Sequence, residues 1–468
     1  MTAGFSWRAY AVALGVGVTA LAAFNTWITA LPLFERRLAG TAYAATIEAW
    51  ISLVYNWANL ATLAVVAAAG TGTRTGTRTG TRSRSNPAAV RLRLGLALHA
   101  LVFAAALVLV LALPVSGAVF FAAALGLVAL SAVAAALIAA VYAVLVLYPL
   151  YAQAVSTGCG VAGLFAAAVS LAVALAKTPP SSVSSSFVPS ESESEPVPGA
   201  GHDASVDATI IGLAVVSYAC LRFLPDSAND SLDGESRPLL SSSDPETPDA
   251  VASKHAKTLP LKQIWWQVKE FSLAIILDFT VTLAVFPALT ASIKSVRPPS
   301  ADTPRFFTDL FVPFMFISFN VGDLLGKMLP GLPFFAIHSP QKTLLFSIAR
   351  TAFIPLLLSC NVPKPSVLPT IFGDFTFLFL VLVMGITNGW IGSNVLMLAG
   401  GSIVLPPGYV DSDLIADGDV AANAHVNAVG DAVEHVSLSL SQRAAADVII
   451  FVMTLGLAIG GACSMFFV

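Results

Sequence analysis

The sequence predicts an all-α integral membrane protein, and three observations support this prediction. Of the 468 residues, 56% are hydrophobic and only 11% are charged, whereas a soluble globular protein has about 25% charged residues. The mean hydropathy is +0.81. Apolar runs of about 20 residues, the length that a helix needs to cross a bilayer core of about 30 Å, recur along the chain. Because these runs are continuous and do not alternate, we expect helices instead of a β-barrel.

Eleven windows are long enough to span a membrane. They are Tyr10 to Leu33, Ala49 to Ala69, Leu94 to Pro114, Ser116 to Tyr148, Tyr151 to Ala176, Ala208 to Leu224, Phe271 to Ile293, Phe306 to Leu329, Leu344 to Asn361, Phe375 to Leu398, and Val448 to Val468. The first window is too long for the core of a signal peptide and has no evident small-residue cleavage site, so we interpret it as the first span. The charged residues inside the windows are Arg222, Asp278, Asp309, Asp323, Lys327 and Arg350.

The charges of the loops predict the orientation. The connection after the second window holds Arg74, Arg78, Arg82, Arg84, Arg91 and Arg93 without an acidic residue. Short loops rich in Arg and Lys face the cytoplasm. With eleven spans, the N-terminus is then expected to be cytoplasmic.

The long loop from Pro225 to Gln263 is expected to be disordered, because much of it is rich in Ser, Asp and Pro. Within this loop, Glu235 precedes Leu239 and Leu240 in a pattern that resembles an acidic dileucine sorting signal. That pattern predicts a sorting adaptor as a partner, in addition to the lipid bilayer, and a vacuolar or lysosomal-type membrane or the plasma membrane as the location. The alternative is a featureless linker.

The composition also argues against several function classes. A net charge of −3 gives no footprint for nucleic acid. The four Cys lie in apolar windows and no two His have metal-ligand spacing, so we expect no disulfide, metal or cofactor. The windows hold no paired His, no Ser with a base and no clustered carboxylates, so an enzyme is not expected.

Polar residues inside the eighth window point to a function. An ionisable group at bilayer depth costs about 2.5 to 3.5 kcal/mol on insertion scales, so it usually faces a bundle interior or an aqueous cavity. Asn320, Asp323 and Lys327 share one helix face, with Phe316 beside them. Asp323 and Lys327, four residues apart, can neutralise one another. This stripe either lines a substrate pathway or joins helices through a buried ion pair.

Other windows add single features. Asn25 is a lone amide beside Phe24 in the first window, and such residues usually bond between helices. Pro287, after Phe286, should kink or break the helix of the seventh window. Broken helices of this kind are frequent in transporters. Gly158 and Gly160 in the fifth window permit close backbone packing.

These windows contain motifs that resemble those of one family, the equilibrative nucleoside transporters. Phe24-Asn-Thr-Trp-Ile-Thr29 is similar to the aromatic-Asn-Phe-Phe-Met-Thr segment of that family, and Phe319-Asn-Val-Gly-Asp-Leu-Leu-Gly326 to its Phe-Asn-x-x-Asp-x-x-Gly-Arg motif. Further similar segments are Tyr151 to Gly158, Phe279 to Ala288, Arg350 to Leu358, Thr387 to Trp390 and Leu455 to Gly460. Each motif is weak alone, but together they occur in the order of the family.

The resemblance implies facilitated transport of nucleosides, and of nucleobases as further substrates, by alternating access. It implies a six-plus-five bundle like the major facilitator fold, with an N-terminal bundle over residues 1–224, the cytoplasmic loop 225–263 and a C-terminal bundle over 264–468. The expected substrate-binding residues are Phe24, Asn25, Phe286, Phe316, Asn320, Asp323 and Lys327, with Asp323 accepting hydrogen bonds from ribose hydroxyls. Pro287, Arg350, Gly158 and Gly160 are expected to have structural or gating roles.

The chain also departs from the family pattern. Lys327 stands where the family usually has Arg, which replaces a planar fork of donors with a point charge. Ile138 and Cys159 stand where the family has Gln residues, so recognition of the base is expected to be altered. A carrier of another polar metabolite, or a proton-coupled nucleoside carrier, remains an alternative.

Overall fold

The structure is a computed structural model, and it describes residues 7–44, 46–72, 87–111, 115–139, 148–176, 255–298, 300, 302–362, 368–407, 409 and 423–467. The sixth predicted span, Ala208 to Leu224, lies outside these residues, as do Glu235, Leu239 and Leu240 of the proposed sorting signal.

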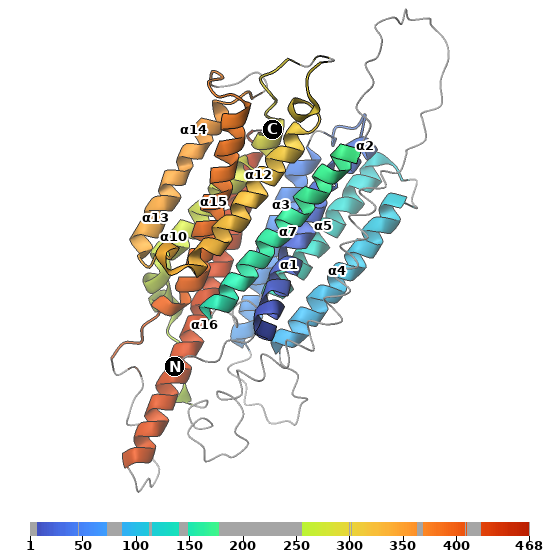
Figure 1. Cartoon of the computed structure of the whole chain (residues 1–468). Coiled ribbons are helices and arrows are strands. Elements are labelled where there is room, and N and C mark those ends of the chain that lie inside the picture. Colours follow the sequence, from blue (N-terminus) through green and yellow to red (C-terminus); the bar gives the residue numbers. More distant parts are fainter. Residues whose placement is uncertain are drawn as a thin grey trace, which may run out of the picture.

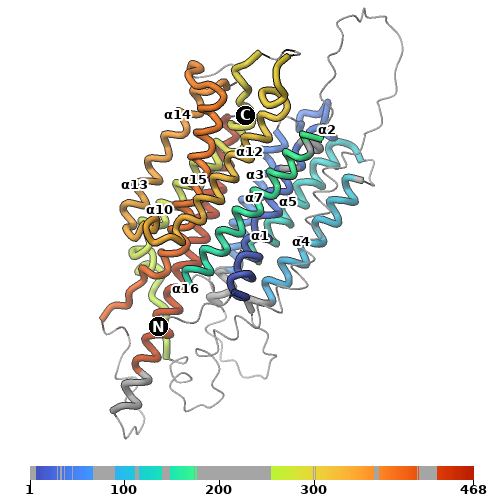
Figure 2. Tube along the Cα trace, in the orientation of Figure 1, coloured from blue at the N-terminus to red at the C-terminus, as the bar shows by residue number. Residues whose placement is uncertain are grey.

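The first five predicted spans all fold as helices. These are α1 (Trp7–Thr29), followed by the short α2 (Leu31–Arg37), and then α3 (Ile47–Gly72), α4 (Pro87–Leu111), α5 (Gly117–Ala139) and α7 (Pro149–Ala176). They form one side of the bundle, coloured blue to green in Figures 1 and 2. We call the end where α2 lies the α2 end, and the end where α1 begins the Trp7 end.

The second side of the bundle, yellow to red in Figures 1 and 2, contains the helices after residue 255. They are α10 (Leu261–Val285), α11 (Ala288–Ser292), α12 (Phe311–Met328), α13 (Pro340–Ala349), α14 (Phe353–Leu358), α15 (Asp374–Leu398) and α16 (Asn423–Ser464). The predicted break of the helix at Pro287 is confirmed, because α10 ends two residues before Pro287 and α11 begins directly after it.

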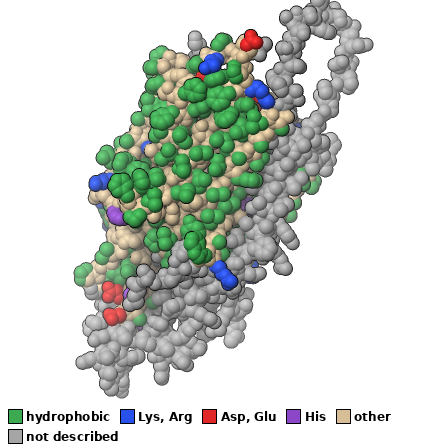
Figure 3. Space-filling model, viewed as in Figure 1, with side chains coloured by type: hydrophobic (Ala, Val, Ile, Leu, Met, Phe, Trp, Pro, Cys, Tyr) green, Lys and Arg blue, Asp and Glu red, His purple; other side chains and the backbone are tan. Residues whose placement is uncertain are grey.

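The described part of the chain contains nine helices long and apolar enough to cross a membrane. Hydrophobic side chains cover the middle of the face in Figure 3, and charged side chains lie mainly toward its two ends. The described part of the chain is therefore helical throughout its regular structure, and the protein is a multi-pass integral membrane protein.

Two spans differ from the sequence prediction. The ninth, Leu344 to Asn361, is not one continuous helix, because a 3₁₀ turn over Arg350–Ala352 separates α13 from α14. The eleventh, Val448 to Val468, is the end of a much longer helix: the 42 residues of α16 extend about 63 Å at 1.5 Å per residue. The first half of α16 was not predicted because it contains polar residues such as Ser437 and Ser441. Both of these side chains accept hydrogen bonds from backbone N–H groups of the segment before α10.

Three pairs of helices join the sides of the bundle. α7 packs against both α12 and α15, and α16 packs against α3. Within each side, α1 packs closely on α7, and α12 on α15. Glycines allow these approaches, since a Cβ at Gly158 would overlap the backbone of Leu14, and a Cβ at Gly160 would lie 3.0 Å from Leu324 Cα. The structure thus places Gly158 and Gly160 at helix contacts.

Between α12 and α15 the glycines are reciprocal. A Cβ at Gly322 or Gly326 would overlap backbone oxygens of α15, and one at Gly385 or Gly389 would overlap backbone oxygens of α12. The backbones of these two helices are therefore in direct contact over at least a full helical turn.

Candidate functional site

A cavity with a volume of about 630 Å³ lies between the two sides of the bundle. Pockets that bind small molecules measure about 300 to 1,000 Å³. The lining residues of α1, α10 and α16, and those of α7 other than Cys159, come from the second halves of these helices, and those of α3 from its first half. Because these parts all face the α2 end, the cavity extends from the centre of the bundle toward that end.

Asp323 and Lys327 form an ion pair that lines this cavity. Both side chains are buried, and Oδ2 of Asp323 accepts the hydrogen bond from Lys327 Nζ. Oδ1 of Asp323 accepts a second bond, of 2.7 Å, from Nδ2 of Asn388 on α15. A carboxylate has about four acceptor positions, so Asp323 keeps acceptor capacity for a ligand.

The polar network continues from Asn388 toward α10 and Arg350. Thr282 Oγ1 donates to Asn388 Oδ1 over 2.8 Å, and Arg350 Nη2 donates to Thr282 Oγ1 over 2.9 Å. Arg350 Nη1 in turn pairs with the carboxylate of the fully buried Asp278. Arg350 does not line the cavity, and it acts as the anchor of the network that holds Asn388 and, through it, Asp323.

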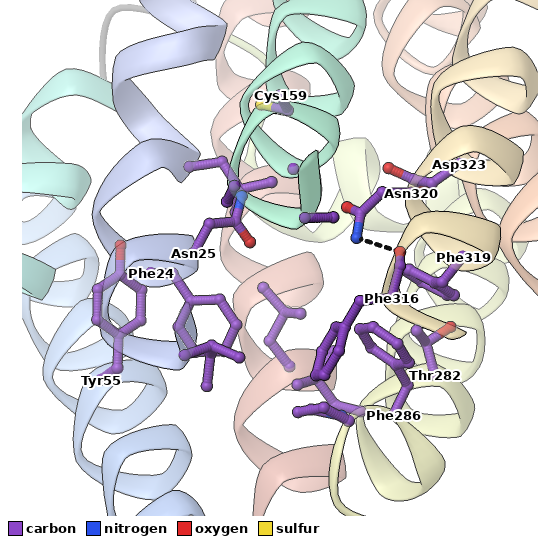
Figure 4. Close-up of a pocket in the computed structure, with 18 of the residues that line it drawn as sticks. Phe24, Asn25, Tyr55, Cys159, Thr282, Phe286, Phe316, Phe319, Asn320 and Asp323 are labelled. Carbon is purple, nitrogen blue, oxygen red and sulfur yellow. Dashed lines mark hydrogen bonds between the residues drawn. The ribbon is translucent and has the colours of Figure 1, made fainter. Parts of the chain in front are cut away.

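Aromatic side chains form two facing walls of the cavity (Figure 4). On one wall, Phe286 stacks on Phe319 with ring centroids 3.9 Å apart and meets Phe316 edge-on at 5.4 Å. On the other wall, Phe24 of α1 contacts Tyr55 of α3 with ring centroids 5.0 Å apart. A cavity of this volume with aromatic walls is suited to a flat, partly apolar solute.

The two predicted amides, Asn25 and Asn320, face one another across a glycine of α7. Asn320 Nδ2 donates to the Phe316 carbonyl over 2.8 Å (Figure 4). A Cβ at Gly163 would overlap Asn320 Oδ1 and would lie 3.6 Å from Asn25 Nδ2. All seven predicted binding residues therefore line one cavity: Phe24, Asn25, Phe286, Phe316, Asn320, Asp323 and Lys327.

Cys159 and Ile138, the two residues that stand where the family has Gln, lie in different places. Cys159 lines the cavity, and its thiol contacts the Gly17 carbonyl at 3.3 Å. Ile138 is buried and close to Gly95 of α4, and Ala135 and Ala139 are the residues of α5 that line the cavity. The cavity wall at α5 therefore carries no polar side chain.

Sequence reasoning missed the cavity residues of α3 and α15. Glu48, Tyr55, Asn56 and Asn59 of α3 and Asn388 of α15 line the cavity. Four of these five residues are polar side chains inside apolar windows, and this pattern could have identified them from the sequence. Glu48 lies one residue before its window. Glu35 of α2 also lines the cavity, and burial raises its pKa while the charge of Lys294 opposes that shift.

Contacts between the two sides differ at the two ends of α7. Toward the Trp7 end, Gln153 Nε2 donates to the Met328 carbonyl over 3.2 Å, and the hydroxyls of Ser156 and Ser393 are 2.5 Å apart. At the α2 end, Arg305 Nη2 donates to the Ala174 carbonyl over 2.7 Å. The two sides of the bundle are thus joined by side-chain contacts of Gln153 and Ser156 toward the Trp7 end, and by Arg305 at the α2 end.

Fold and cavity together define a class, a multi-pass helical membrane protein with a solute-sized, mainly apolar cavity that carries a few polar groups between two groups of helices. Residues 226–406 match the model of the nucleoside transporter family. This chain is 33% identical over 170 residues to equilibrative nucleoside transporter 2 of Rattus norvegicus, which is 36% of this chain and 35% of the relative. It is 33% identical over 135 residues to equilibrative nucleoside transporter 1 of the same organism, 28% of each chain.

A more distant relative is the nucleoside transporter FUN26 of Saccharomyces cerevisiae, 27% identical over 139 residues, which is 28% of this chain and 26% of the relative. The matched part of the chain thus spans about a third of the length of the first two relatives or less. Over that part, these matches confirm the resemblance to the equilibrative nucleoside transporter family, which is a family of transporters and not a class of enzymes.

Proposed function

We propose that this protein carries nucleosides passively across a membrane by alternating access of the central cavity. The observation that carries the proposal is the carboxylate of Asp323, which is held by Lys327 and Asn388 at a cavity with aromatic walls. A carboxylate with free acceptor positions suits the vicinal hydroxyls of ribose. The aromatic rings suit the faces of a base.

The contacts along α7 support alternating access. In the present conformation Gln153 and Ser156 join the two sides of the bundle toward the Trp7 end, while the cavity extends toward the α2 end. A carrier must also form the opposite state, in which the contacts at the Trp7 end open and α7 closes on α12 at the α2 end. The α7–α12 and α3–α16 contacts are where the two sides of the bundle would move.

The remaining sequence predictions belong to the same proposal. They are the six-plus-five division at residues 1–224 and 264–468, the cytoplasmic N-terminus, and the vacuolar, lysosomal-type or plasma membrane location. Binding of a sorting adaptor at Glu235, Leu239 and Leu240 is part of it as well. The two-sided arrangement of the helices in Figure 1 is compatible with the division.

Uptake into proteoliposomes tests the proposal. We expect radiolabelled adenosine and uridine to enter vesicles that contain the wild-type protein, with free adenine and uracil compared alongside. Asp323→Asn should lower riboside affinity by about tenfold or more, because bonds to charged groups contribute about 1.5 to 3 kcal/mol each. Asp374→Asn is the matched control, since Asp374 is equally buried but bonds to Ser295 and Val296 away from the cavity.

Lys327→Arg tests the departure from the family. The planar fork of Arg can bond a ligand and Asp323 together, so we expect this variant to discriminate more strongly between ribosides and their deoxyribose analogues. A wild-type protein that ignores ribosides but passes another solute would overturn the substrate assignment.

A further inference from the structure

The cavity has a second polar surface on α3, on the side of the bundle opposite Asp323. Tyr55, Asn56 and Asn59 line the cavity from this helix. Residues at these spacings lie on one face of an α-helix. The two amides thus face the cavity from one face of α3.

The two amides differ in how their polar atoms are satisfied. Asn56 is buried, and its Nδ2 donates to the Ser52 carbonyl over 2.8 Å within the same helix. Oδ1 of Asn59 is buried and has no hydrogen-bond partner. Because a buried acceptor without a partner is costly, and because Asn59 lines the cavity, a rotation of this side chain that turns the oxygen toward a bound solute would give it a donor.

The neighbouring helix α5 has no polar side chain on the cavity wall that could bond a solute in place of Asn59. The residues of α5 that line the cavity are Ala135 and Ala139, and Ile138 points its bulk toward Gly95 instead. On this side of the cavity, the aromatic pair Phe24 and Tyr55 supplies the surface on which a flat ring can pack. An acceptor next to such a surface is an arrangement that can recognise a heterocyclic base by its edge.

The common bases share one property at that edge. Adenine and cytosine present an exocyclic amino group, and guanine and uracil present a ring N–H, so each base can donate to an amide oxygen. We infer that Oδ1 of Asn59 accepts a hydrogen bond from the N–H groups of the base, while Asp323 binds the ribose at the opposite wall. The inference rests on the proposed function, and it assigns recognition of the base to α3.

The test compares adenosine with purine riboside, which is adenosine without its exocyclic amino group. Both compete with radiolabelled uridine for uptake into proteoliposomes, and binding is also followed by thermal stabilisation of the detergent-solubilised protein. Asn59→Leu removes the acceptor at similar volume. Asn394→Leu is the matched control, because both ends of the Asn394 amide are satisfied, by the Ile337 N–H and the Trp390 carbonyl, outside the cavity.

The wild type should bind adenosine about 3- to 10-fold more tightly than purine riboside, which is the range expected for one neutral hydrogen bond. Asn59→Leu should abolish that preference while the unfolding midpoint of the ligand-free protein stays the same or rises. Asn394→Leu should lower the midpoint and keep the preference.

Three results would overturn the inference. In the first, Asn59→Leu keeps the preference for adenosine. In the second, it lowers the affinity for both ribosides equally. In the third, it destabilises the ligand-free protein as much as Asn394→Leu does. A wild-type protein that binds neither riboside would overturn the proposed function itself. This outcome can be told apart from the three results above, because each of those requires that the wild type binds a riboside.

Discussion

Nδ2 of Asn388 donates a hydrogen bond of 2.7 Å to Oδ1 of Asp323, and this contact connects the carboxylate of the cavity with the buried pair of Arg350 and Asp278. The intermediate group is Thr282, which donates to Asn388 and accepts from Arg350. The orientation of Asp323 therefore depends on residues of α10, α15 and the turn between α13 and α14, in addition to its own helix.

Asn388→Ala should weaken riboside binding without removing it. Asp323 would keep Lys327 as a partner but lose the bond that fixes its second oxygen, so we expect the substrate concentration at half-maximal uptake to rise about tenfold. The maximal rate should change less than the affinity. Uptake measured over a range of uridine concentrations separates the two, and an unchanged affinity would show that Asn388 does not position the carboxylate.

Arg350→Met should destabilise the protein by about 3 to 5 kcal/mol, because it leaves the fully buried Asp278 without its cation. The double variant of Arg350→Met with Asp278→Leu should recover much of this loss, since it removes both charges. Chemical unfolding in detergent, followed by far-ultraviolet circular dichroism, measures both. A double variant as unstable as the single one would mean that Thr282, Thr387 and Met384, the other partners of Arg350, contribute more than the ion pair.

Gly163→Ala and Gly158→Ala should have different effects although both lie on α7. The new methyl group at position 163 would meet the amide of Asn320, which can turn away, so we expect reduced uptake with a nearly unchanged unfolding midpoint. The methyl group at position 158 would meet the backbone of α1 at Leu14, which cannot move alone. Gly158→Ala should therefore lower the yield of folded protein, as size-exclusion chromatography would show.

Cys159 should report the opening of the cavity. In a background with Cys220, Cys360 and Cys463 replaced by Ala, a methanethiosulfonate reagent should label Cys159, and a bound riboside should slow the labelling. Arg305→Gln removes the bond from Arg305 to the Ala174 carbonyl at the α2 end and should speed labelling severalfold from that side. Equal rates with and without Arg305 would show that this bond does not control access.

Most of the fold could be predicted because the solvent is lipid. Long apolar runs leave few options other than helices, and the rarity of charges inside them drew attention to Asp323 and Lys327. The sequence did not predict the 3₁₀ turn over Arg350–Ala352 within the ninth span. The prediction was wrong for the length of α16, whose first half is too polar for a hydropathy window.

The site was predicted only in part, for a related reason. Asp323 and Lys327 are neighbours on one helix, so their contact follows from helical spacing. The contacts of Asp323 with Asn388 and of Arg350 with Asp278 join residues 65 and 72 positions apart, and no local pattern encodes such pairs. The amides of α3 carried a local signal, but an isolated Asn in a span is more often a bond between helices.

The reciprocal glycines of α12 and α15 have a mechanical consequence. Because the two main chains are in direct contact, few side chains lie between them that could change conformation. If one helix slid or tilted against the other, their backbone atoms would clash. We expect α12 and α15 to move as one rigid body, so that Asp323 and Asn388 move together. The carboxylate and the amide would then keep their mutual alignment through the change of conformation that we propose.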